Sequence, residues 1–112
     1  MSQDNDAVAR QVSAYNRRDL DAFLECYAPD VVIENTKGEV VMEGRNAMRA
    51  AYGELFAESP ELHVDIATRI RIGAYVIDEE VVTGRLGSPE PLRVAAIYHV
   101  RDGAIDRVRL IR

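Results

Sequence analysis

Apolar positions in the first half of the chain recur with the period of amphipathic helices. Val8, Val12 and Tyr15 follow one another at steps of four and three residues, which predicts a helix over Asp6–Arg17. A second helix is predicted after Asp19, whose carboxylate can cap it, and it should stop at the next proline. Its apolar stripe is Leu20, Phe23, Leu24 and Tyr27.

The second half of the chain has mostly period two, which is typical of strands. From Leu62 to Ile72 apolar and polar residues alternate, and this alternation predicts a long strand. The order of all elements, with short local connections, predicts an α+β domain with a mostly antiparallel sheet and helices on one face. The other predicted elements are strands at Val31–Asn35 and Glu39–Glu43, a helix that begins after Gly44 with Asn46 as candidate cap, and strands at Tyr75–Thr83, Leu92–Arg101 and Ile105–Ile111.

Length and charge restrict the class of protein. The chain has 112 residues, which fits one domain over residues 1–112. Its 14 Lys and Arg residues against 19 Asp and Glu give a formal net charge of −5, which disfavours nucleic acid and anionic membranes as partners. No apolar run reaches the length of about 20 residues that spans a bilayer, and the first residues carry acids where a signal peptide carries bases. We therefore expect a cytoplasmic protein with neither a nucleic-acid nor a membrane partner.

Motifs for metal, nucleotide or nucleophilic chemistry are absent from the sequence. It contains no HExxH, CxxC, P-loop, GxGxxG or GxSxG pattern, and two histidines with one cysteine do not make a zinc site. Cys26 adjoins the stripe of the second helix, which favours a structural thiol over a nucleophile. A single cysteine also favours a reducing compartment. We expect no metal and no cofactor.

Several polar side chains share a face with apolar ones. Gln11 and Tyr15 lie on the inner stripe of the first helix, Tyr52 on the inner face of the third, and Asn35 and Tyr98 on the inner faces of their strands. A buried polar group needs a partner, a water molecule or a ligand. Two interpretations stay open. Either these groups line a mainly apolar small-molecule pocket, or they satisfy one another in an ordinary core.

The strand over Tyr75–Thr83 contains a candidate base. Its alternation places Tyr75, Ile77, Glu79 and Val81 on one face, and Glu79 is the lone acid of that more apolar face. We therefore expect Glu79 to face the interior. An unpaired buried carboxyl has a raised pKa and can exchange protons near neutrality. The alternative is a Glu79 that is paired with an arginine or solvated.

The opposite face of the predicted sheet mixes charges with apolar residues. Such a face is usually solvated, but apolar side chains set among charges of both signs also fit a complementary interface. We expect a homodimer through this face, and no catalytic role for its histidines. The predicted members of the face are His63, Asp65, Arg69, Arg71, Val76, Asp78, Glu80, Val82, Arg93, Ile97, His99 and Arg101.

Several stretches, taken in this order of elements, resemble the nuclear transport factor 2-like superfamily, and within it the SnoaL-like and steroid Δ-isomerase-like group. They are AYNRRDLDAF, YAPDVVIEN, EGRNAMRAAYGELF, GAYVIDEEVVTG and AIYHVRDGAIDRVRLI. The resemblance covers nearly the whole chain. It implies a cone-shaped, cystatin-like α+β barrel, in which a curved and mostly antiparallel sheet wraps on three helices. It also implies a deep pocket and, commonly, a homodimer through the sheet face.

The site residues of steroid isomerases, which this chain resembles, are only partly present in this sequence. The family's Asp base on the first strand corresponds to Asn35, preceded by Glu34, and its oxyanion-holding Tyr corresponds to Gln11. Its second donor, a protonated Asp, corresponds to Tyr98, while the supporting tyrosine of the third helix is kept as Tyr52. An asparagine lacks the basicity to move a proton. Gln11 and Tyr98 can still donate hydrogen bonds to a carbonyl or enolate oxygen.

Two functions follow as hypotheses. In the first, the chain is a homodimer that binds a small apolar molecule, and Tyr98, Gln11 and Tyr52 orient a ligand with a carbonyl or hydroxyl group. In the second, it is a cofactor-free isomerase or polyketide cyclase-like enzyme with Glu79 or Glu34 as general base and Tyr98 and Gln11 as oxyanion donors. A pure assembly module is a third possibility and predicts a filled core without a cavity.

Overall fold

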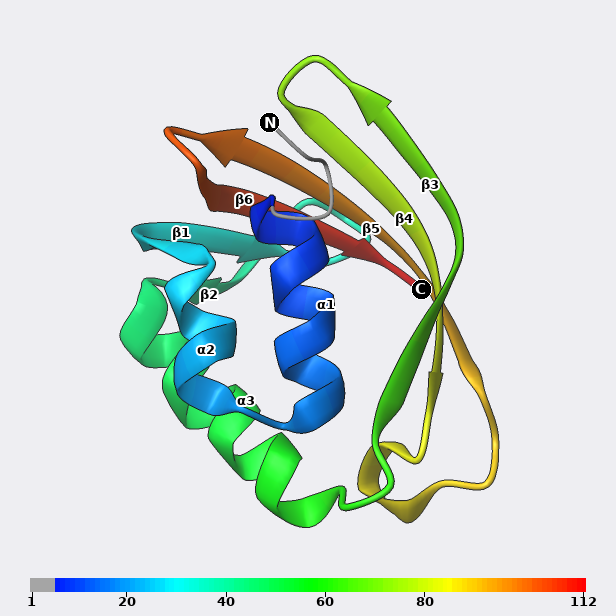
Figure 1. Cartoon of the computed structure of the whole chain (residues 1–112). Helices are drawn as coiled ribbons and strands as arrows, with labels where there is room; N and C mark the ends of the chain where they lie inside the picture. The colour runs from blue at the N-terminus through cyan, green and yellow to red at the C-terminus, as the bar shows by residue number, and fades with distance from the viewer. Residues whose placement is uncertain (1–5) are drawn as a thin grey trace.

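The computed structural model describes residues 6–112 as three α-helices and one six-stranded sheet that curves around them (Figure 1). Residues 1–5, with which the predicted domain begins, lie outside the described part. The strands follow the order β2-β1-β6-β5-β4-β3, and all neighbours are antiparallel except β1 and β6, which are parallel. The predicted α+β class with a mostly antiparallel, curved sheet is therefore confirmed.

The helices form close to where the apolar period predicts them. They are α1 (Ala7–Arg17), α2 (Leu20–Glu25) and α3 (Arg45–Glu58). The carboxylates of Asp6 and Asp19 cap α1 and α2 by accepting backbone N–H groups, because the first turn of a helix leaves its amides without intrahelical partners.

Two predictions about the helix ends are wrong. The second helix ends at Glu25, and Tyr27 begins a strand instead of completing the helical stripe. The third helix begins directly after Gly44, which occupies the N-cap position, so Asn46 lies inside the first turn and is not the cap.

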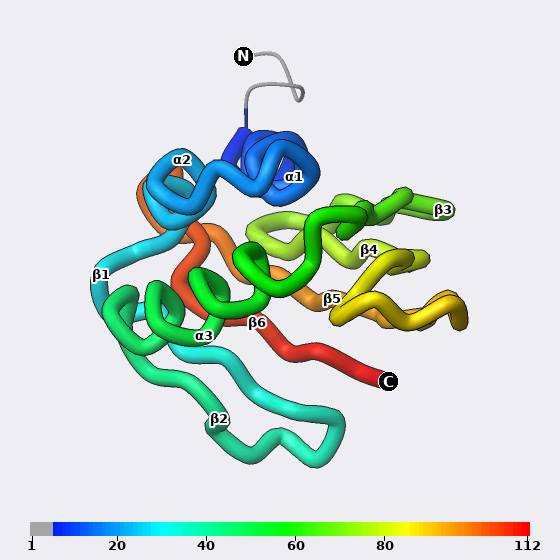
Figure 2. Tube along the Cα trace, turned by 90° about the horizontal axis from the view of Figure 1, so that it is seen from below, coloured from blue at the N-terminus to red at the C-terminus, as the bar shows by residue number. Residues whose placement is uncertain are grey.

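Within residues 6–112 the helices are followed or interrupted by six strands and one 3-10 turn. They are β1 (Tyr27–Glu34), β2 (Val40–Glu43), β3 (His63–Ile72), β4 (Tyr75–Thr83), η2 (Arg85–Gly87), β5 (Leu92–Arg101) and β6 (Ala104–Ile111). Helix α3 contacts β1, β2 and η2, and Figure 2 shows it lying between the β1–β2 hairpin and the chain that follows β4. No helix within residues 6–112 is both long enough and apolar enough to cross a membrane.

A bulge in β3 reverses the alternation that the sequence suggests. Ile66 lies opposite Glu80 on β4, but Thr68 lies opposite Glu79, so Ala67 is the extra residue. Directly opposed residues of antiparallel strands point to the same face. The inner face of β3 therefore passes from even-numbered residues before the bulge to odd-numbered residues after it, as a bulge in one strand requires.

After the bulge, the arginines of β3 turn toward the helices and the isoleucines turn away. Arg69 binds Asp78, and Arg71 forms an ion pair with Asp6 at the start of α1. Ile70 and Ile72 are exposed on the outer face, where 64% of the surface of Ile72 is accessible. The prediction of one continuous apolar face from Leu62 to Ile72 is wrong for this reason.

The face assignment on β4 is also reversed. Val76, Asp78, Glu80 and Val82 are buried on the inner face, whereas Tyr75 is exposed on the outer face. The predicted mixed-charge outer face therefore loses six members to the interior of the sheet: Arg69, Arg71, Val76, Asp78, Glu80 and Val82.

The core fills the space between the helices and the concave side of the sheet. Its most buried large side chains are Phe23, Leu24, Ile33, Met48, Leu62 and Ile105. Tyr15, Phe23, Tyr52 and Phe56 pack edge-on or tilted against one another, with ring centroids 4.8 to 6.5 Å apart. This aromatic cluster joins α1, α2 and α3 into one wall.

Candidate functional site

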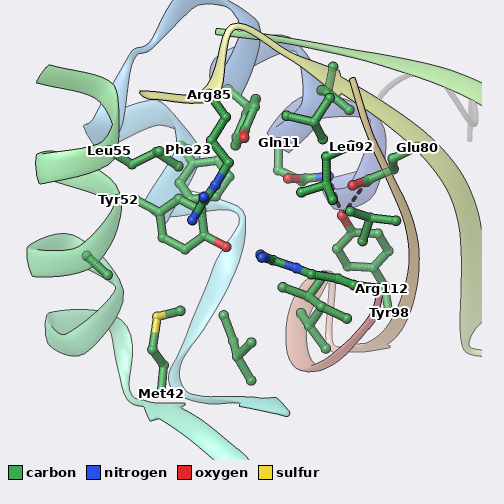
Figure 3. A pocket seen from close by; sticks show the side chains of 18 of the residues that line it. Gln11, Phe23, Met42, Tyr52, Leu55, Glu80, Arg85, Leu92, Tyr98 and Arg112 are labelled. Atoms are coloured by element: carbon green, nitrogen blue, oxygen red, sulfur yellow. Dashed lines mark hydrogen bonds between the residues drawn. The ribbon is translucent and has the colours of Figure 1, made fainter. Parts of the chain in front are cut away.

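A cavity of about 170 Å³ lies between the helices and the sheet. Its volume is similar to that of an apolar cavity of roughly 150 Å³ that admits benzene. Apolar and aromatic side chains form most of its wall, and a few polar groups enter it (Figure 3). The lining residues are Gln11, Tyr15, Phe23, Tyr27, Ile33, Met42, Ala51, Tyr52, Leu55, Val64, Glu80, Val82, Arg85, Leu92, Val94, Tyr98, Val108, Leu110 and Arg112.

One chain of hydrogen bonds joins four of the polar residues in the pocket. The Tyr27 hydroxyl donates to Gln11 Oε1 over 3.0 Å, and Gln11 Nε2 donates to the Tyr98 hydroxyl oxygen over 3.1 Å. The Tyr98 hydroxyl in turn donates to Glu80 Oε2 over 3.0 Å (Figure 3). Because these bonds are buried and each group holds the next, the Tyr98 ring and the Glu80 carboxyl have fixed positions at the pocket wall.

The Glu80 carboxyl is the titratable group that fits acid-base chemistry here. Its surface is 8% exposed, and burial raises its pKa from the ordinary 4.5 to about 7. The charge of Asp78 raises this pKa further, while the hydrogen bond from Tyr98 and the charge of Arg69 lower it. A carboxyl with a pKa near neutrality can both take up and release a proton at physiological pH.

Asp78 lies two residues before Glu80 on the same face, but an arginine binds its carboxylate. It is fully buried, and Arg69 binds it through two parallel hydrogen bonds, with Nε 2.7 Å from Oδ1 and Nη2 2.9 Å from Oδ2. The same bonds raise the pKa of Arg69. Both carboxylate oxygens of Asp78 are therefore engaged by Arg69, whereas Glu80 faces the pocket.

The tyrosines of the pocket supply hydroxyl donors. Burial raises the pKa values of Tyr15, Tyr27 and Tyr98, and it raises that of Tyr52 to about 12. All four therefore keep their protons at physiological pH. Within residues 6–112 the hydroxyls of Tyr15 and Tyr52 have no hydrogen-bond partner, and the Tyr52 hydroxyl points into the pocket (Figure 3). A ligand oxygen can accept from them.

Four predicted site residues come together in this cavity. Gln11, Tyr15, Tyr52 and Tyr98 all line it. The space between the helices and the sheet is therefore not completely filled by side chains.

The prediction that Glu79 faces the interior is wrong. Its Oε2 accepts a hydrogen bond from Arg93 Nη2 over 2.6 Å on the outer face, and this bond lowers the pKa of Glu79. The alternative that the sequence left open, pairing with an arginine, is the one observed. The reason is the direction of β4, which turns Asp78 and Glu80 inward, where Arg69 compensates the charge of Asp78.

Asn35 and Glu34 also lie outside the pocket. The Asn35 side chain shapes the turn between β1 and β2, because Oδ1 accepts the backbone N–H groups of Lys37 and Glu39. Glu34 lies on the outer face, where Arg107 and Arg109 bind its two carboxylate oxygens. Turn formation and ion pairing account for these two polar residues without a ligand.

Among the polar residues that line the pocket, Tyr27, Glu80, Arg85 and Arg112 are absent from the predicted site. The Asp-Glu-Glu run at 78–80 is a signal for an acid in the pocket, but choosing among its members requires the phase of the strand. Arg85 and Arg112 lie outside the regular strands, where residue periodicity does not predict direction.

Comparison with models of known protein families identifies the family of this chain. The model of the SnoaL-like domain matches residues 8–108. The chain belongs to the SnoaL-like domain family. Among curated proteins, none matches this SnoaL-like chain significantly in sequence.

Solved structures agree with the family. A cystatin-fold protein from Novosphingobium aromaticivorans is 32% identical, with 95% of each chain covered and a TM-score of 0.86. A proposed polyketide cyclase from Sinorhizobium meliloti is 22% identical, with 93% of this chain and 92% of that chain covered and a TM-score of 0.79. A protein from Catenulispora acidiphila with a ketosteroid isomerase-like fold, solved with trimethylamine, is 24% identical, with 95% and 84% covered and a TM-score of 0.76. The last two similarities are similarities of fold.

Proposed function

We propose that this SnoaL-like protein binds a small, largely apolar carbonyl compound and moves a proton on it without a cofactor, with Glu80 as the general base. The observation that carries the proposal is the Glu80 carboxyl, which lies at the wall of an apolar cavity, is held by Tyr98, and has a pKa of about 7. An effective general base has a pKa close to the pH at which it works.

The proposed reaction begins at a carbon next to the carbonyl group. The ionised Glu80 takes a proton from this carbon, and the electron pair of the broken C–H bond moves into an enolate. The Tyr52 hydroxyl can donate a hydrogen bond to the enolate oxygen, and such a donor stabilises the developing charge. The Tyr98 hydroxyl becomes a second donor once Glu80 has taken up the proton and the bond from Tyr98 to Glu80 is released. Where a C=C bond is conjugated with the enolate, Glu80 returns its proton to the far carbon of that bond and the double bond moves, which is an isomerisation. Alternatively the enolate carbon attacks a second carbonyl carbon, and Glu80 returns its proton to the alkoxide that forms, which is a cyclisation.

The similar structures support this class of reaction. One of them bears the name of a proposed polyketide cyclase and another that of a ketosteroid isomerase-like fold. Enolate chemistry is common to cyclisation and isomerisation of carbonyl compounds. The proposed base is Glu80 and neither Glu79 nor Glu34, the two bases that the sequence suggests. The carboxylates of Glu79 and Glu34 lie on the outer face in ion pairs.

We also propose that the protein is a homodimer through the outer face of the sheet. Ile70, Ile72 and Tyr75 are exposed there at 46%, 64% and 49%, and they come from adjacent strands with Ile70 and Ile72 opposite Ile77 and Tyr75. Exposed apolar side chains gathered on one face are typical of an interaction surface. The resemblance to the nuclear transport factor 2-like superfamily implies the same arrangement.

The exchange of α-hydrogens of acetophenone in D₂O, followed by proton NMR, tests the proposed chemistry. Wild-type protein should accelerate this exchange over buffer, and Glu80→Gln should lower the acceleration by about 100-fold or more, the usual contribution of a general base. Glu79→Gln is the matched control, since its carboxyl lies one residue away on the outer face. It should keep the wild-type rate.

Two results would overturn the proposed chemistry. Equal exchange rates in the wild type and in Glu80→Gln would exclude Glu80 as the base. Binding of acetophenone without any acceleration over buffer would leave the first hypothesis, a protein that binds a ligand and performs no proton transfer.

A further inference from the structure

Two arginines that line the pocket have no partner among residues 6–112. Arg85 and Arg112 line the cavity, and within residues 6–112 neither guanidinium takes part in an ion pair or a hydrogen bond. Arginines elsewhere in the sheet are used differently: Arg69, Arg93 and Arg107 each bind a carboxylate. Arg85 is half-buried and Arg112 is exposed, so in a chain whose net charge is −5 two cations lie at the solvent-facing part of the pocket, where an anionic ligand can reach both.

The backbone holds the first of these arginines in place. Arg85 follows Gly84, whose φ of 72° and close approach to Glu61 exclude a side chain, because an added Cβ would lie 2.2 Å from the Glu61 carbonyl oxygen. The next backbone N–H, that of Leu86, donates to the buried hydroxyl of Ser59 over 2.9 Å. Arg85 therefore enters the pocket from a turn that is fixed on both sides.

The second arginine comes from the end of β6. Its backbone N–H donates to Thr36 Oγ1 over 3.1 Å, which ties this segment to the turn between β1 and β2. In Figure 3 the guanidinium groups of Arg85 and Arg112 extend into the pocket on the side of the Tyr52 hydroxyl, while Glu80 and Tyr98 lie on the other side. Both positive charges lower the pKa of Tyr52 against the effect of burial, in agreement with this proximity.

An anion between the two guanidinium groups would satisfy both. Arginine presents a planar set of N–H donors that matches a carboxylate, and hydrogen bonds between charged partners are stronger than those between neutral groups. A carboxylate fits better than a phosphate, because a single negative charge is repelled less by an ionised Glu80 across the cavity. The apolar wall and the volume of about 170 Å³ leave room for a body the size of one ring.

We propose that the ligand of this pocket is a small carboxylic acid, with its carboxylate held by Arg85 and Arg112 and its apolar body inside the cavity. The inference rests on the proposed function in that it uses the same pocket. Together they define the substrate class as a keto acid, whose carbonyl group lies between the Tyr52 hydroxyl and Glu80. Neither arginine takes part in proton transfer, so both are binding residues that select the charge of the ligand.

Calorimetric titration with 4-oxo-4-phenylbutanoate and with its methyl ester tests this assignment. The two probes share a ring and a ketone and differ in the negative charge. Wild-type protein should bind the acid at least about tenfold more tightly than the ester, in line with hydrogen bonds to a charged group. Arg85→Met and Arg112→Met should each reduce the affinity for the acid and leave that for the ester unchanged.

Arg93→Met is the matched control, since it removes the same charge from the outer face, where Arg93 binds Glu79. It should leave the affinities for both probes at their wild-type values. Equal affinities of the wild type for acid and ester, equal losses in all three variants, or no binding of the acid at millimolar concentration would each overturn the carboxylate assignment. The α-hydrogen exchange of acetophenone, a neutral ketone, tests the role of Glu80 independently of the two arginines.

Discussion

Replacing Glu80 by glutamine keeps the size of the side chain and an oxygen that accepts from Tyr98, and it removes the charge. The pKa of Glu80 is raised by burial from 4.5 to about 7, so the folded chain holds this proton up to a higher pH than the unfolded chain does. The stabilisation from the proton is complete below pH 4.5. It is lost progressively as the pH rises, and the loss is complete above a pH of about 7.

The size of this effect follows from the two pKa values. One pKa unit corresponds to about 1.4 kcal/mol, so the difference between 4.5 and about 7 amounts to about 3 kcal/mol in the free energy of unfolding. Glutamine cannot ionise and avoids this loss. Glu80→Gln should therefore be more stable than the wild type by up to about 3 kcal/mol above neutral pH, and the difference should vanish toward pH 4.5.

Urea unfolding of both proteins, repeated from about pH 5 to about pH 8, measures the difference directly. Glu79→Gln is the control, because Arg93 lowers the pKa of Glu79 and its loss gives no gain in stability at high pH. A Glu80→Gln protein that is less stable than the wild type at high pH would refute the reasoning. So would a difference between the two that does not change with pH.

Three further predictions concern stability and assembly. Arg69→Met leaves Asp78 buried without its bidentate partner. Chemical denaturation should therefore show that the free energy of unfolding falls by about 3 kcal/mol. A decrease below about 1 kcal/mol would mean that the fold does not require this ion pair. Gly84→Ala brings a Cβ within 2.2 Å of the Glu61 carbonyl oxygen, and thermal unfolding should occur at lower temperature, whereas an unchanged Tm would argue against a fixed turn. Ile72→Glu should convert a dimer into a monomer in light scattering, and a monomeric wild type would contradict the proposed interface.

The sequence predicts the helical part of the pocket well. On α1 and α3 the apolar neighbours of Gln11, Tyr15 and Tyr52 recur every three or four residues, so only one face of each helix can be buried. Tyr98 is similarly determined, since Val94 and Ala96 share its face and are buried. Where apolar residues occupy one side, the period alone fixes the direction of a polar side chain.

The sequence does not predict the sheet faces on β3 and β4. Both faces of β4 carry apolar residues and acids, so alternation separates Glu79 from Glu80 without telling which of them points inward. The bulge at Ala67 then reverses β3, and nothing in a regular alternation marks the extra residue. Burial of Asp78 becomes favourable only through its ion pair with Arg69, which depends on that reversal.

The titration of the Glu80 side chain tests the central claim most directly. Carbon-13 NMR of protein labelled at glutamate carboxyls follows each group separately, and the signal that disappears in Glu80→Gln identifies the one in the pocket. We predict a titration midpoint of about 7 for this carboxyl. A midpoint near the ordinary value of 4.5 would contradict both the buried position of Glu80 and its proposed role as the base.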